Sequence, residues 1–158
     1  MTTWIGQRLI DLSACLADEL TQPTCWHGVW PGEEVPMDFC AGECDDDRCG
    51  MAYVRMSQMF PSTEFPVADA AAQCTSPLAY EIMVGVTRCA PVAQVDGSLP
   101  DPEEFAASAL LQAEDQAAMV RAIRCCMSSD MLHVVGLWLP IGPLGGCVGG
   151  QMTVMVAR

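Results

Sequence analysis

Positive charge is scarce in this chain of 158 residues. Lys and Arg together number 7, against 20 Asp and Glu, which gives a net charge of −13. Without a basic stripe, the sequence excludes tight binding to nucleic-acid phosphates, although DNA could still slide through an acidic channel. Charged residues make up only 17% of the chain and hydrophobic residues 51%. We therefore expect the protein to bury apolar surface against protein partners.

Catalytic signatures are missing as well. The sequence contains no G-x-S-x-G, H-E-x-x-H or G-x-x-x-x-G-K-[ST] motif. Its glycine-rich stretch at 142–150 lacks the G-x-G-x-x-G spacing and precedes a predicted strand, not a helix. With two histidines, any Cys–His pair would have to use His27 or His133. We expect no enzymatic activity, no catalytic residue and no cofactor.

Long uninterrupted hydrophobic segments are also lacking. Met131–Ala157 has no formal charge, but six glycines and two prolines interrupt it. A membrane-spanning helix needs about 20 mostly apolar residues without such breaks. The first residues, MTTWIGQRLIDL, do not show the pattern of a secretory signal peptide. We expect no membrane segment.

The apolar residues that are present follow two periods. Steps of three and four predict a helix from about Trp4 to Leu20. A second helix is predicted from Asp101, as N-cap, to about Met127, with a break near Gln112–Asp115. Strict alternation over Leu78–Arg88, with apolar residues on both faces, predicts a central strand.

Shorter strands are predicted at 25–34 and 50–60, and a β-hairpin with a long or bulged connection at 133–158. In the hairpin, two apolar runs, Val134–Leu139 and Met152–Val156, flank a connector rich in Gly and Pro. The element order predicts a single α+β domain over residues 1–158. We expect a mainly antiparallel sheet of four to five strands, with the N-terminal helix and the second long helix packed on it.

A cysteine-rich loop at 40–49 holds Cys40, Cys44 and Cys49. Their spacing differs from the C-x2-C knuckle of zinc sites. Free thiols, disulfides and a zinc site all remain open, the last with a fourth ligand from Cys25, His27 or Cys74. The acidic residues Glu43 and Asp45–Asp47 lack the alternating calcium-loop pattern and favour a solvated loop.

Three segments resemble a known class of proteins. The first is Tyr-Glu-x-x-Val-Gly-Val-x-Arg-Cys-x-Pro at Tyr80–Pro91, and the second is a helix that opens at Pro102 with two glutamates and contains Asp115. The third is Gly-x-Trp-x-Pro-x-Gly-Pro-x-Gly-Gly-Cys-x-Gly-Gly at Gly136–Gly150. Together with the N-terminal amphipathic helix, they resemble the neck proteins of long-tailed phages that infect actinobacteria, namely tail terminators and head-to-tail connectors.

This resemblance implies a tail-terminator-like α+β protomer that assembles into a ring, typically a hexamer, at the top of the tail tube. The implied partners are further copies of the chain, the adjacent connector and tail tube proteins, and genomic DNA that passes through the lumen without sequence-specific binding. The implied location is the head–tail junction of a siphovirus virion, after synthesis in the host cytoplasm. A small zinc- or disulfide-stabilised interaction module is the alternative.

The terminal hairpin is the predicted assembly element. Its strands are uncharged, and a buried Trp commonly dominates an interface. We therefore predict that its apolar side chains contact neighbouring protomers, namely Trp138, Val134, Leu137, Met152 and Val154.

Overall fold

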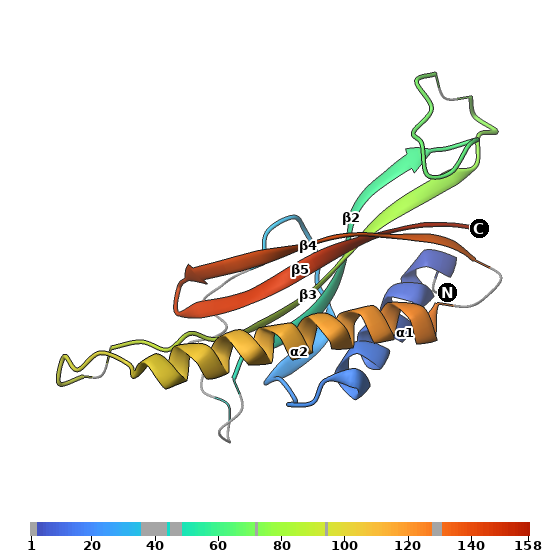
Figure 1. The fold of residues 1–158 in the computed structure, drawn as a ribbon. Coiled ribbons are helices and arrows are strands. Elements are labelled where there is room, and N and C mark those ends of the chain that lie inside the picture. Colours follow the sequence, from blue (N-terminus) through green and yellow to red (C-terminus); the bar gives the residue numbers. More distant parts are fainter. Residues whose placement is uncertain (1–2, 36–43, 45–48, 72, 94, 128–130) are drawn as a thin grey trace.

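The computed structural model describes residues 3–35, 44, 49–71, 73–93, 95–127 and 131–158. Within them, two helices lie on one side of a five-stranded sheet (Figure 1). The helices are α1 (Trp4–Glu19) and α2 (Pro102–Cys126). The strands are β1 (Trp26–Val29), β2 (Met51–Pro61), β3 (Leu78–Cys89), β4 (Leu132–Leu144) and β5 (Cys147–Ala157).

The sheet is mixed, with the strand order β1-β2-β3-β5-β4. Strand β1 pairs in parallel with β2, and the remaining neighbours pair antiparallel. The predicted α+β class and the mainly antiparallel sheet agree with this arrangement. The predicted central position of Leu78–Arg88 is confirmed, because β3 lies between β2 and β5.

Both helices begin where the sequence predicts. The hydroxyl of Thr3 accepts a hydrogen bond from the backbone N–H of Gly6 (3.2 Å) and so caps α1. Asp101 is the N-cap residue of α2, although its side chain makes no capping hydrogen bond. The predicted break near Gln112–Asp115 is wrong, since α2 is continuous there. The polar residue that suggested a break, Asp115, is buried and paired with an arginine.

The core lies between the helices and one face of the sheet. Alternate residues of three neighbouring strands point toward the helices, because successive side chains of a strand lie on opposite faces. α1 and α2 contribute matching apolar stripes. The fully buried members are Leu16, Ala52, Val54, Ile82, Val84, Val86, Ala118, Met119, Ala122, Ile123, Val154 and Val156.

No helix of the described residues covers the opposite face of the sheet, and we call it the open face (Figure 1). The other set of alternate side chains lies on it. Across this face, the Tyr53 hydroxyl donates to Oε1 of Gln151 (2.9 Å), and Nη2 of Arg55 donates to Sδ of Met83 (3.0 Å). The open face is therefore more polar than the helix-covered face.

The terminal hairpin is tighter than predicted. Strands β4 and β5 are joined by a two-residue turn, Gly145–Gly146. The other Gly and Pro residues of the predicted connector lie inside the strands, so the connection is not long. Two register shifts interrupt the β4–β5 pairing, between Val135 and Trp138 and between Ile141 and Leu144. The predicted bulging is thus present, within the ladder instead of at the turn.

Candidate assembly surface

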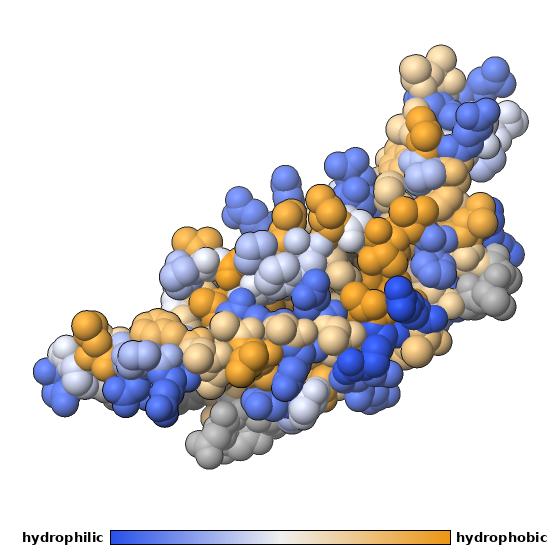
Figure 2. Space-filling model, in the orientation of Figure 1, coloured by the Kyte–Doolittle hydropathy of each residue, from blue (hydrophilic) through white to orange (hydrophobic). Residues whose placement is uncertain are grey.

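Strand β4 forms one edge of the sheet and exposes many apolar side chains. It has no Asp, Glu, Lys or Arg over its 13 residues. Figure 2 shows apolar side chains interspersed with polar ones on the side of the molecule where β4 and α2 are seen. The exposed apolar residues of β4 are Leu132, Val134, Val135, Leu137, Leu139 and Leu144. Long uncharged edges of this kind favour pairing with another chain.

The predicted contact residues divide between surface and interior. Val134 and Leu137 are 38% and 79% exposed, so both are accessible to a partner. Met152 and Val154 are 3% and 0% exposed and belong to the core. Their prediction as contact residues is wrong, because β5 lies between β3 and β4 and turns these side chains toward the helices.

The exposure of Trp138 is intermediate between those of these two groups. Trp138 is half-buried and packs against the core, with its indole ring directly over Gly150. A Cβ at position 150 would collide with the ring, so this glycine is required for the stacking. The indole N–H is buried and has no hydrogen-bond partner among the described residues. Trp138 therefore stabilises the protomer, and its role as an interface anchor remains a prediction.

A buried ion pair joins β3 to α2. Arg88 donates from Nε and Nη2 to the two carboxylate oxygens of Asp115, at 2.9 and 2.7 Å. The same guanidinium donates to the backbone carbonyls of Gln22 (2.7 Å) and Pro23 (3.4 Å). Both charged side chains are at most 7% exposed. This arrangement clamps the segment after α1 to β3 and α2, so its role is structural.

A second buried arginine lies on the open face. Arg55 is 8% exposed, and its Nε atom has no hydrogen-bond partner. Of the ion pairs among the described residues, none includes Arg55. It lines a depression of about 540 Å³ together with Met56, Ser57, Gln58 and Met83, and with Gly32, Glu33 and Glu81.

Tyr53 lies two residues before Arg55 on the same strand face. Its ring covers Gly85, where a Cβ would collide with it. Burial raises the pKa of Tyr53 to about 12, and the nearby positive charge of Arg55 opposes this rise. The hydroxyl is consequently neutral and donates to Gln151.

Several cysteines form disulfides. Cys44 is bonded to Cys25, just before β1, and Cys49 to Cys89, the last residue of β3. Of the three alternatives left open by the sequence, the structure therefore has disulfides at Cys44 and Cys49, with partners outside the loop, and Cys40 lies outside the described residues. A further disulfide, Cys15–Cys126, joins α1 to α2, and Cys147 is also disulfide-bonded. Cys74 and Cys125 are free and exposed.

The described residues offer no metal site, since no group of three His, Cys, Asp or Glu side chains comes together in them. Cys25, Cys44 and Cys49 cannot act as thiolate ligands of zinc, because their sulfurs are in disulfides. His27 is exposed beside α1, and His133 is exposed on β4. Glu43 and Asp45–Asp47 lie outside the described residues.

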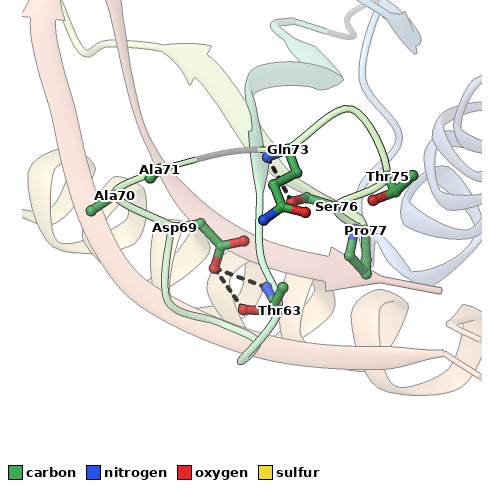
Figure 3. Close-up of a pocket in the computed structure, with 8 residues that line it drawn as sticks. All are labelled: Thr63, Asp69, Ala70, Ala71, Gln73, Thr75, Ser76 and Pro77. Atoms are coloured by element: carbon green, nitrogen blue, oxygen red, sulfur yellow. Dashed lines mark hydrogen bonds between the residues drawn. The ribbon is translucent and has the colours of Figure 1, made fainter.

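A polar pocket of about 440 Å³ lies in the loop between β2 and β3 (Figure 3). Oδ1 of Asp69 accepts from the backbone N–H and the hydroxyl of Thr63, at 3.0 and 2.9 Å. The hydroxyl of Ser76 accepts from the backbone N–H of Gln73 (3.1 Å). These hydrogen bonds shape the loop.

No protein-family model matches the sequence, and no curated protein matches it significantly. Among the described residues, no helix has both the length and the hydropathy needed to cross a membrane.

Proposed function

We propose that this chain is a structural virion protein that forms a ring at the phage head–tail junction. In this role it is a tail terminator or a head-to-tail connector with a tail-terminator-like fold. The observation that carries the proposal is the uncharged edge strand β4, which exposes six large apolar side chains. The motifs at Tyr80–Pro91 and Gly136–Gly150 add the resemblance to phage neck proteins.

The edge strand needs a partner for physical reasons. Soluble monomers usually protect an edge with charges, prolines, bulges, a short strand or a covering element. Strand β4 has two prolines and two register shifts but no charge. Strand β4 runs for 13 residues without a charged side chain, and Leu132 and Leu137 are 61% and 79% exposed. A neighbouring protomer would cover these side chains and pair the free backbone groups, as in a head-to-tail ring.

The second helix exposes apolar residues too. The seven residues from Asp101 to Ala107 are all exposed. Phe105 and Leu110 in this half of α2 are 52% and 68% exposed. Figure 1 shows this half of α2 extending toward one end of the molecule. An isolated protein gains nothing from such an extension, whereas a ring protomer can bury it against a neighbour or an adjacent ring.

The charge of the chain suits a DNA conduit. A net charge of −13 repels the phosphate backbone, so DNA would pass through the lumen without being held. Disulfides persist in oxidising surroundings, which is compatible with a particle that acts outside the cell. The neighbours in the particle would be further copies of the chain, a connector protein and the tail tube.

Leu137→Lys tests this function. Leu137 is largely exposed, so a charge there should leave the protomer folded but prevent apolar contact. We expect heads and tails that fail to join, or tails of wrong length, by electron microscopy of particles made with this variant. Leu137 is a sharper probe than Trp138, whose removal would also damage the core.

Ile10→Lys on α1 is the matched control, since Ile10 is 49% exposed and lies away from β4. Particles with this variant should be normal. A chain that is absent from virions and monomeric at every concentration would contradict the proposed function and would favour the interaction-module alternative.

A further inference from the structure

Arg55 is a buried cation that makes no ion pair with a described residue. It is only 8% exposed, and its Nε atom is unpaired. Its one hydrogen bond to a described residue goes to the sulfur of Met83, a weak acceptor. Burying a charge in this way is costly unless an ion pair or stronger hydrogen bonds compensate it. An incoming carboxylate could therefore supply the ion pair that the described residues do not.

The depression around Arg55 is accessible from the edge of β2. Strand β1 pairs with β2 only from Met51 to Val54. From Met56 onward, the β1 side of β2 has no strand beside it in the described part of the chain. An incoming segment could therefore reach the guanidinium along this edge.

The carboxylates that already line the depression restrict what can bind. Glu81 accepts a hydrogen bond from the hydroxyl of Ser57 (2.6 Å), so it is engaged within the protomer. Glu33 also lies in the lining. A small free anion would be repelled by both groups and would gain only the contact with Arg55. A carboxylate on a protein gains support from the rest of its interface, which makes it the better occupant.

A second copy of the chain has suitable carboxylates. The first turn of α2 contains Glu103 and Glu104, both exposed, and Phe105 beside them is exposed as well. The first turn of α2 lies at one end of the protomer (Figure 1), whereas Arg55 lies in the middle of β2, opposite Met83 of β3. Two different sites of this kind can join neighbouring copies head to tail, and such a contact can close into a ring.

We propose that the Arg55 depression receives a carboxylate, Glu103 or Glu104, from the first turn of α2 of a second copy. This inference rests on the proposed ring function and names the residues that join neighbouring protomers. The apolar groups around the ion pair, Met56 and Met83 on one copy and Phe105 on the other, would exclude water from it.

Sedimentation velocity on the full chain over a range of concentrations tests the contact. We expect Arg55→Met to raise the association Kd by about 30-fold or more, because the incoming carboxylate loses its partner. The double variant Glu103→Arg/Glu104→Arg should weaken association similarly without touching the buried site. Combining it with Arg55→Glu should restore part of the association. Arg121→Met, which removes an exposed pair with Glu19, should change nothing.

The outcomes separate this inference from the proposed function. A wild-type chain that is always monomeric overturns both. A wild-type ring with unchanged association in Arg55→Met and in Glu103→Arg/Glu104→Arg overturns the inference alone. Weakening by Arg55→Met but not by the double variant overturns the assigned donor.

A small-anion site would give a different result. In that case acetate would raise the Tm of the wild type but not of Arg55→Met, while association stayed equal in both. That pattern would also overturn the inference. The Tm of each variant, measured in dilute solution, shows whether it is folded.

Discussion

Arg88 and Arg55 are both buried arginines, yet their surroundings differ. Arg88, on the helix-covered face, has a bidentate carboxylate and two backbone carbonyls. Arg55, on the open face, has one hydrogen bond to a thioether and an unpaired Nε. The Arg88 site is complete, whereas among the described residues no carboxylate pairs with Arg55. This difference is the reason that we propose a partner for the open face and none for the face that the helices cover.

The central strand and the edge strand of the sheet differ in the same way. Strand β3 is buried between two neighbours, and its helix-facing residues Ile82, Val84 and Val86 are fully buried. Strand β4, at the edge, has an alternating pattern but leaves Leu137 and Leu139 exposed. Burial on folding therefore stabilises the centre of the sheet, and we expect burial on assembly to stabilise its edge.

Removing Asp115 should have the largest effect on stability. Asp115→Ala leaves Arg88 as a buried charge with no carboxylate, which typically costs about 3–5 kcal/mol. We expect a loss of this size in the free energy of unfolding, measured by urea denaturation. Glu19→Ala, in the exposed Arg121–Glu19 pair, should cost less than about 1 kcal/mol. Equal losses of unfolding free energy in the two variants would contradict the larger contribution that we assign to the buried ion pair.

Removing the disulfide between the helices should have a smaller effect. The Cys15–Cys126 bond closes a long loop, with a sequence separation of 111. Replacing both residues with Ala should destabilise the protomer by about 2–4 kcal/mol in the same denaturation assay. Cys125→Ser changes a free, exposed thiol and serves as the control, with no expected loss. An unchanged midpoint of urea denaturation in the double variant would show that packing alone holds α1 and α2 together.

A smaller loss of stability is expected at high pH, from Tyr53 on the open face. Burial raises the pKa of Tyr53 from about 10 to about 12, so the folded state keeps the phenol proton to higher pH than the unfolded state. The stabilisation from this group is present below pH 10 and falls as the pH rises toward 12. Between about pH 9 and about pH 11, the wild type should lose about 1 kcal/mol more than Tyr53→Phe. Parallel losses in the two proteins would argue against a buried neutral tyrosine.

Local patterns predicted the elements of this fold well. The alternation over Leu78–Arg88 predicted a central strand, and β3 is central. The apolar period after Thr3 predicted α1, which the hydroxyl of Thr3 caps. Both predictions depend on interactions between residues close in sequence or on burial of one whole face. Such burial requires apolar residues at regular spacing, which can be recognised in the sequence.

Pairings between distant residues could not be predicted in the same way. Arg88 and Asp115 are 27 residues apart, and nothing local distinguishes Asp115 from the exposed acids of α2. The partners of Cys44 and Cys49 depend on strand order, which the spacing of the cysteines does not encode.

A bulge decides which side chains of β4 share a face, and the sequence pattern does not reveal it. Strict alternation would place Val134 and Trp138 on one face of β4. The register shift between Val135 and Trp138 turns Trp138 toward the core, while Val134 remains on the other face. The unpaired state of Arg55 had no sequence signal, because it depends on which side chains fail to reach it.

The mass of the purified full chain, measured by native mass spectrometry over a concentration series, tests the central claim most directly. A protomer built for assembly should appear as one closed oligomer, at six times 17.0 kDa for the expected hexamer. Dilution should convert it to folded monomers without a ladder of open chains. A single species at 17.0 kDa across the whole series would contradict the account.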